Sequence, residues 1–348
     1  MVLLRAMDHF REGGFERLLP AARQWASYHL EYLLFGLERA LLTDRQWFEY
    51  TVWRNQRGID AAADPRELRY VDPARIRRKS PWETRFCFRK FGAVRAGNWD
   101  VDPPRLADKF DEIWEALESR YVDGNAWEDV ALVQEVAAGN RRWRLATGEE
   151  VWEWVDDLDA VYRSIRDNGY RSVREIHGVP FEEAAEPSYD SPVERFLPVA
   201  NESMFFYETD DLTLFDWMAD IQVDIGRDGE ILQHNGRHRI WFAQHLDVAE
   251  IPVCVVVRHE KWQQLRDEIA NASSKSELSD RARRHLDHPD MTDVVDDLNV
   301  TEGRTDEARQ RPLPERGIQP ERTIDQPRSD RIGLPISSDT PVRTGRKH

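Results

Sequence analysis

The sequence predicts a mixed α/β (α+β) domain, and three observations lead to that class. Residues 251–257 form an almost wholly apolar run, which is typical of a strand covered on both faces. Before this run, residues 220–233 contain two stretches in which apolar and polar residues alternate. These stretches flank the turn residues 226–229, and this pattern predicts a β-hairpin. Apolar residues recur at helical spacing over residues 235–246, so strands and helices alternate in this part of the chain.

The chain before this core is expected to be helical first and then to enter the sheet. Residues 10–58 carry apolar side chains at roughly three-to-four spacing, which predicts a helical hairpin that packs on the main domain or on a partner. A short strand is expected within residues 68–76, ended by a turn at Asp72-Pro73. Apolar and basic residues alternate over residues 85–92, which suits a half-buried strand.

The middle of the chain is expected to form helices that end at glycine turns. Residues 109–136 predict two helices separated by a turn at Gly124. Residues 154–176 predict a helix that stops at Asn168-Gly169, because these residues supply a left-handed C-cap. After the apolar strand, residues 260–270 predict the helix that closes the domain.

Composition divides the chain into three parts. Residues 1–62 form a helical N-terminal extension, and residues 63–272 form the main domain with an inserted segment at about 82–150. Residues 273–348 form a tail rich in Pro, Arg and acidic residues with almost no aromatic residues. We expect this tail to be mostly disordered, although a short helix fits residues 279–286.

The charge of the chain limits its partners. A formal net charge of −16 disfavours non-specific binding to nucleic acids or anionic membranes, so any phosphate-binding face must be local. Only 6 of the 49 basic residues are lysine, which resembles salt-adapted haloarchaeal proteins; a high-GC bacterial or phage protein is the alternative. The two cysteines lack metal-site spacing, and no apolar stretch is long enough to span a bilayer. We therefore expect a cytoplasmic protein without a metal site or membrane contact.

A cationic cluster at the start of the helix after the hairpin is the candidate site. Asn235-Gly236 turns the chain from strand to helix, and Gly236 lets the backbone approach a ligand closely. The N–H groups at a helix N-terminus attract anions, and Arg237 and Arg239 add guanidinium groups that suit phosphate. His238 would orient the ligand or donate a hydrogen bond, and it is the one candidate for catalysis. The alternative is that these side chains are solvated or paired with some of the 65 acidic residues.

Three more residues are candidates for the rim of the same pocket. His234 precedes the turn, and Arg258 and His259 end the strand that follows the helix. The alternative for Arg258 and His259 is that they mark the exit of the strand to solvent.

Two stretches, "LDAVYRSIRDNGY" and "DGEILQHNGRHRIWFAQHLDVAEIPVCVVV", resemble the ParB/sulfiredoxin superfamily. The matching residues are Ser164, Ile165, Gly169, Gly236, His238, Arg239, Ala243, Ile251, Pro252 and Val253. The resemblance covers about residues 66–80 and 155–260. The stretches "VRAGNWD", "RYVDGNAWED" and "VVVRHEKWQ" look like uncharacterised haloarchaeal and phage ParB-like proteins. The resemblance implies a ParB/sulfiredoxin-like core. The cofactor is left open, with a nucleotide and Mg²⁺ as the candidate.

Departures from the family pattern narrow the activity that the resemblance implies. Arg237 stands where sulfiredoxins have their cysteine, which excludes sulfiredoxin chemistry. In ParB-type CTP switches, the turn that binds the triphosphate contains a glycine, a glutamate and cationic residues. The corresponding turn in this chain has the glycine and the cationic residues but not the glutamate. Asn235 replaces the aspartate of ParB-like serine kinases, and an amide is a poorer Mg²⁺ ligand than a carboxylate. ParB proteins also have a helix-turn-helix module after this domain, where this chain has only its tail.

We therefore expect a domain that binds a nucleotide or another phosphate group at residues 235–239, and we leave open whether it is an enzyme. One alternative is a DNA-associated module that contacts backbone phosphates with the same face, since nuclease activity is attributed to some relatives. The other alternative is a non-catalytic structural domain whose helices serve assembly. The oligomeric state is left open.

Overall fold

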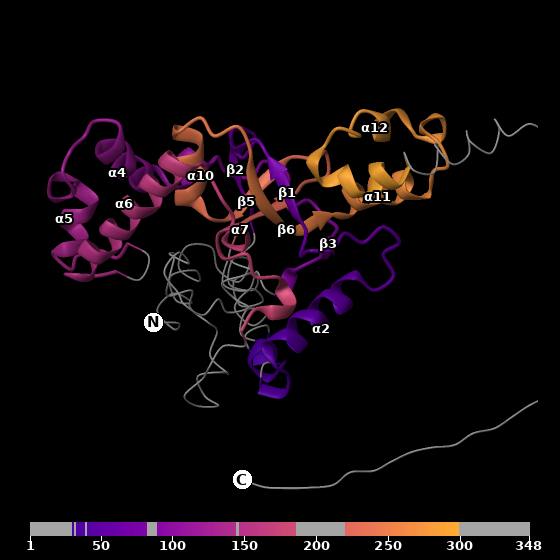
Figure 1. Ribbon diagram of the computed structural model, residues 1–348, viewed down its shortest axis with the longest axis horizontal. Coiled ribbons are helices and arrows are strands. Elements are labelled where there is room, and N and C mark those ends of the chain that lie inside the picture. The colour runs from indigo at the N-terminus through magenta and orange to yellow at the C-terminus, as the bar shows by residue number, and fades with distance from the viewer. Residues whose placement is uncertain are drawn as a thin grey trace, which may run out of the picture. The chain divides into compact units, whose positions relative to one another are not determined.

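A mixed sheet of six strands forms the centre of the fold (Figure 1). The computed structural model describes residues 30–298 except for 31–32, 39, 82–88, 144–145 and 186–219. The strand order is β1–β6–β4–β5–β2, and β3 also pairs with β6. The strands are β1 Leu68–Val71, β2 Arg78–Lys79, β3 Ala93–Arg95, β4 Ile221–Ile225, β5 Ile231–Asn235 and β6 Ile251–His259. The mixed α/β class predicted from the sequence is therefore confirmed.

Long-range pairing defines the sheet. The hairpin expected over residues 220–233 is present, because β4 and β5 pair antiparallel. β4 pairs parallel with β6, β5 pairs parallel with the two-residue strand β2, and β1 pairs antiparallel with β6. The strand expected over residues 85–92 lies mostly outside the described residues, and its described end, 89–92, is not a strand. The strand there begins at Ala93 instead and pairs parallel with β6.

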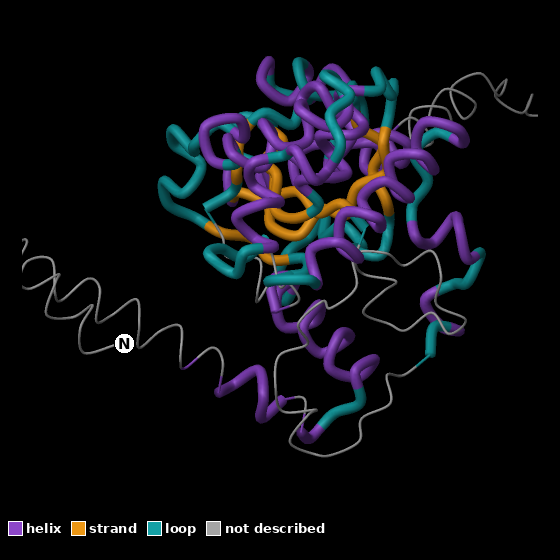
Figure 2. Tube along the Cα trace, turned by 90° about the vertical axis from the view of Figure 1, so that its left-hand side faces the viewer, coloured by secondary structure: helices purple, strands orange, loops and turns teal. Residues whose placement is uncertain are grey.

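β6 is buried on both faces, as its apolar sequence predicts, and Figure 2 shows the strands enclosed by helices. Ile251, Val253 and Val255 pack in one hydrophobic cluster with α10 (Arg237–His245) and α11 (Glu260–Asn271). Cys254 and Val256 pack in a second cluster with α2 (Asp44–Gln56). Because alternate side chains of a strand point to opposite faces, helices cover the sheet on both sides.

α2 packs on the main domain, which is one of the two placements expected for the N-terminal helices. Its residues Trp47 and Phe48 are almost fully buried, and Phe48 lies 5.0 Å from the ring of Phe181. The helix begins with a capping box at Thr43, in which the hydroxyl accepts from the amide of Gln46. The rest of the expected hairpin, residues 10–29, lies outside the described residues.

The middle of the chain forms a helical layer on the outer side of α10. This layer contains α4 (Asp111–Tyr121), α5 (Ala131–Ala137) and α6 (Glu150–Asn168), which share a third hydrophobic cluster with Trp241 and Phe242 of α10. Ile240 and Ala243 of the same helix face the sheet. α10 is therefore buried on two sides, and Figure 1 shows it between the strands and α4–α6.

Short helices complete the described residues. They are α3 (Leu106–Lys109), α7 (Val173–His177) and α12 (Asp280–Arg283). α6 stops at Gly169, which has φ +73°, so the glycine stop predicted within residues 154–176 is confirmed and α7 is a separate helix. Among the described residues, no helix is long and apolar enough to cross a membrane.

The folded part of the chain extends beyond the boundary expected at residue 272. Leu278, Ala282 and Met291 are buried in the same cluster as α11, so residues 275–298 are packed rather than disordered as their composition suggested. The short helix expected at 279–286 is present only as the four-residue α12. Residues 299–348 lie outside the described residues.

Candidate functional site

The turn from β5 into α10 requires glycine at position 236. Gly236 is the N-cap of α10 and has φ +89° and ψ 28°, in the left-handed region that other residues rarely adopt. A Cβ atom at this position would lie 2.9 Å from Cγ1 of Ile221. The backbone of the turn therefore approaches β4 too closely for any side chain. The Asn235 amide stabilises the turn, because its Oδ1 accepts from the Gly236 N–H at 2.8 Å.

The first turn of α10 presents backbone amides that do not join its helical hydrogen bonds. The first amide bonded within the helix is that of Ile240, which donates to the Gly236 carbonyl at 2.9 Å. The amides of residues 237–239 precede it and carry the positive end of the helix dipole. The anion-attracting geometry expected at this turn is thus present.

Arg237 is a half-buried cation at this helix end. Its guanidinium lies over the Phe110 ring at 5.1 Å from the ring centre. Burial lowers the pKa of Arg237, because removal from water disfavours the charged form. Among the described residues, no carboxylate lies within ion-pairing distance of its guanidinium. Within the part of the chain that the structure describes, Arg237 is therefore not paired with a carboxylate, which was the alternative considered for it.

Lys79 is a second buried cation near the turn, and the sequence did not single it out. It ends β2 opposite Gln233, and its Nζ lies within hydrogen-bond distance of three backbone carbonyls, those of Ser80 at 3.0 Å, His234 at 3.3 Å and Gln233 at 3.4 Å. Burial lowers the pKa of Lys79 to about 8. The charges of Lys109, Arg237 and Lys90 act in the same direction, and Asp224 opposes them. The one signal in the sequence was its rarity, since lysine occurs only six times in the chain.

Asp224 offsets part of the effect of burial on Lys79 through its charge, but the two form no ion pair among the described residues, and the oxygens of Asp224 are hydrogen-bonded to other groups. Its Oδ2 accepts from the Ser80 hydroxyl and lies 2.9 Å from His234 Nδ1, and its Oδ1 accepts from the Val257 amide at 3.0 Å. His234 is fully buried in this polar cluster. It therefore lies beneath the turn, and its expected place on a pocket rim was wrong.

His238 points away from the anion-attracting end of the helix. It is 2% exposed, and its Nε2 accepts a hydrogen bond from Trp143 Nε1 at 3.3 Å. The Trp154 ring lies 5.8 Å from it. Because an indole N–H can only donate, Nε2 carries no proton here and the proton of the neutral ring is on Nδ1. The residue attaches α10 to the helical layer, and this contact replaces the ligand contact expected for it.

Arg239 also differs from the expected phosphate clamp. It is 6% exposed and folds back over the turn, so that its Nη2 lies 3.5 Å from the position a Cβ of Gly236 would take. Its charge acts on the buried carboxylate of Asp220, whose pKa is raised by burial and lowered in part by Arg174 and Arg239. The charge of Arg239 thus acts on an acid inside the domain, and the cation whose charge interacts with that of Arg237 is Lys79.

Arg258 and His259 lie at the other end of the sheet. In the strand register, Arg258 is level with Ile225, whereas Asn235 is level with Gln222, three residues earlier on β4. Neither residue lines a pocket at the turn, and neither marks an exit to solvent, since both are buried. Both of the placements considered for them were therefore wrong.

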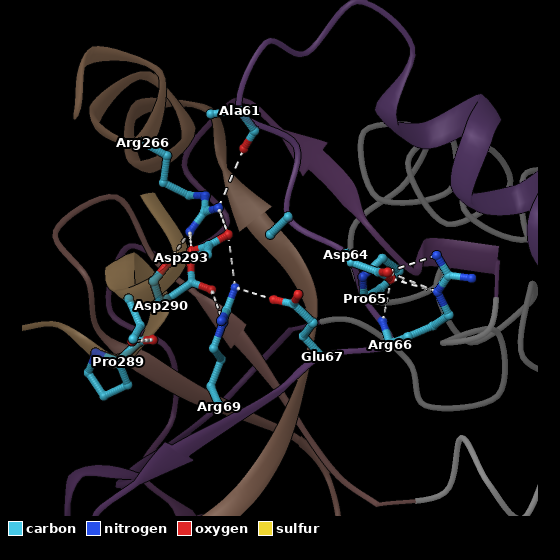
Figure 3. A network of polar contacts seen from close by, with 12 residues as sticks. Ala61, Asp64, Pro65, Arg66, Glu67, Arg69, Arg266, Pro289, Asp290 and Asp293 are labelled. Atoms are coloured by element: carbon cyan, nitrogen blue, oxygen red, sulfur yellow. Dashed lines mark hydrogen bonds and ion pairs between the residues drawn. The ribbon is translucent and has the colours of Figure 1, made fainter. Parts of the chain in front are cut away.

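Arg258 belongs to a buried ionic network around Asp290. Its Nη2 lies 2.6 Å from Asp290 Oδ1, and Arg69 and Arg266 also approach this carboxylate (Figure 3). Burial alone would raise the pKa of Asp290, but the charges of Arg258, Arg266 and Arg69 hold it well below its usual range. The network fastens the segment after α12 to the sheet.

His259 connects the end of β6 to two other segments. Its Nε2 donates to the Gly97 carbonyl at 2.8 Å, and its Nδ1 accepts from the Lys261 amide at 3.0 Å, which caps α11. Both ring nitrogens are used in structural hydrogen bonds, so the geometry assigns His259 no contact with a ligand.

Comparison of the chain with protein-family models, with curated proteins and with solved structures gives no match. Within the described residues, no group of three or more His, Cys, Asp or Glu side chains is arranged to hold a metal ion. The groups that the described residues place at this turn are Arg237, Lys79 and the first backbone amides of α10.

Proposed function

We propose that the protein binds a phosphate group at the N-terminus of α10, between Arg237 and Lys79. One observation carries the proposal: burial lowers the pKa of both cations, and in the described part of the chain neither forms an ion pair with a carboxylate, although the charge of Asp224 acts on Lys79 at longer range. Charged groups withdrawn from water are normally paired. An anionic ligand would provide the missing partner.

The ligand we propose is a phosphorylated small molecule, and a nucleotide fits best. Arg237 offers a planar guanidinium, Lys79 a compact ammonium and the helix its backbone amides, a combination that suits phosphate oxygens. The resemblance to the ParB/sulfiredoxin superfamily supports a nucleotide, with Mg²⁺ as the accompanying ion. The Asn235 Oδ1 already accepts from the Gly236 amide, which leaves this side chain poorly suited as an additional Mg²⁺ ligand.

The geometry favours a single phosphate group over a nucleic-acid backbone. Duplex binding usually draws on many exposed cations that contact successive phosphates. Arg237 and Lys79 are instead half-buried and close enough to affect each other's charge. This arrangement supports a localised anion site in a chain with a formal net charge of −16.

Calorimetric titration of the full-length chain with pyrophosphate, CTP, ATP and ADP, each with and without Mg²⁺, tests the proposal. We expect saturable binding of at least one of these compounds. Replacing Arg237→Ala or Lys79→Met should weaken that binding about tenfold or more, since each removes a positive charge from the site.

Arg142→Ala is the matched control, because Arg142 is exposed and its removal changes the net charge equally. Circular dichroism establishes that each variant is folded. Equal binding by Arg237→Ala and Arg142→Ala, or no binding by the wild-type chain, would overturn the proposal. Binding of duplex DNA without binding of any phosphate compound would favour the DNA-associated alternative instead.

A further inference from the structure

A groove of about 400 Å³ lies between α4 and α10, one helical turn beyond the contact of Arg237 with Phe110. On α4 it is lined by Trp114 and Glu118, which are four residues apart and share one face of the helix. On α10 it is lined by Trp241, Gln244 and His245, which likewise share a face. The volume falls within the usual range for ligand sites, roughly 300–1,000 Å³.

The charged groups of the groove are acidic. Glu118 and Asp123 line it, and both side chains are exposed. Within the described residues, neither carboxylate has a hydrogen-bond or ion-pair partner. The groove therefore presents two carboxylates whose charge is not balanced by a neighbouring arginine, in a chain that has 43 arginines.

Gln244 adds a neutral acceptor to the groove. The Gln244 amide nitrogen donates both of its hydrogens to backbone carbonyls, to Pro73 at 2.8 Å and to Ile76 at 3.0 Å. These two bonds fix the side chain and leave its Oε1 as the atom that can accept a hydrogen bond from a ligand. A ligand that binds the two carboxylates and this oxygen must donate hydrogen bonds.

Aromatic rings complete the lining. The rings of Trp241 and His245 stack at 4.8 Å with an angle of 14° between their planes, and Trp114 contributes a second indole. Stacked rings present flat surfaces on which a planar group packs well. Indole faces also attract cations.

We propose that the α4–α10 groove binds an arginine side chain presented by a peptide of a partner protein. A guanidinium is planar, positively charged and only a donor, so it matches the rings, the carboxylates and the Gln244 oxygen together. A lysine ammonium matches the charge alone. This proposal is independent of the proposed phosphate site, because it concerns a different set of residues and a ligand of opposite charge.

Titration of the full-length chain with N-acetyl-arginine amide, followed by NMR of the tryptophan indole N–H groups, tests this inference. We expect saturable shifts of the Trp114 and Trp241 signals. N-acetyl-citrulline amide has the same shape without the charge, and N-acetyl-lysine amide has the charge without the planar group. Both should bind more weakly, citrulline by about tenfold.

The double variant Glu118→Gln with Asp123→Asn should weaken arginine binding about tenfold, because it removes both carboxylates without changing their size. Glu115→Gln with Glu135→Gln is the matched control, since it removes two exposed charges from the same helical layer outside the groove. Equal binding of arginine and citrulline, equal binding by the two double variants, or no saturable binding would overturn the inference.

Discussion

Residues 235–239 are adjacent in the sequence but lie in different environments. Arg237 lies over Phe110 at the start of α10, His238 contacts Trp143, and Arg239 folds back over Gly236. A helix turns by about 100° per residue, because it has about 3.6 residues per turn, so neighbouring side chains must diverge. The sequence alone could predict that the chain turns at Gly236 and that a helix begins there. The direction of each side chain depended on segments elsewhere in the chain.

Lys79 illustrates what sequence reasoning could not find. It lies more than 150 residues before the turn, and only the pairing of the two-residue strand β2 with β5 brings it there. Such a short strand has no recognisable sequence pattern. The cation was therefore visible in the sequence, but its position beside Arg237 was not.

Replacing Gly236→Ala tests the close approach of the turn to β4. The variant must hold alanine at φ +89° and place its Cβ against Ile221, so the free energy of unfolding should fall by about 2–4 kcal/mol. Gly139→Ala is the control, since Gly139 has φ +76° but open space around it, and its cost should be about 1 kcal/mol. Urea unfolding measures both. Equal losses would show that contact with Ile221 is unimportant.

At the scale of elements, strongly patterned segments were predicted well and polar ones were not. β6 follows from its apolar run, and α6 follows from its helical periodicity and its glycine stop, although α6 begins at Glu150, four residues earlier than predicted. The segment after α11 looked disordered because it is rich in charge. Its charges are instead paired with distant partners, since Asp290 contacts arginines of β1, β6 and α11. Pairing over such separations leaves no local pattern in the sequence.

Replacing Asp290→Asn should destabilise this attachment strongly. The change removes the carboxylate on which Arg69, Arg258 and Arg266 converge, and it leaves buried cations short of a partner. Breaking a buried ionic group in this way typically costs about 3–5 kcal/mol. Urea unfolding of this variant and of Asp287→Asn, an exposed aspartate three residues away, measures the effect. A loss no larger than that of the control would contradict the importance of the network.

The whole molecule combines an acidic chain with local buried cations. Its formal net charge of −16 produces a negative field that disfavours anions in general. A phosphate site in such a protein must rely on short-range contacts, and these are screened less by salt than long-range attraction is. The overall class could be predicted from composition and periodicity. The order of the six strands could not, because it depends on pairings between distant segments.

The titration of Lys79 tests the central claim most directly. The chain has only six lysines, so NMR of lysine-labelled protein can follow each one, with Lys261 as an internal control for changes in the buffer. In the protein without ligand, the pKa of Lys79 should be about 8, because burial and neighbouring cations disfavour its charge. A bound phosphate should raise this pKa, and by linkage phosphate binding should weaken as the pH rises above about 8. An unchanged pKa of Lys79 at saturating pyrophosphate would contradict the account.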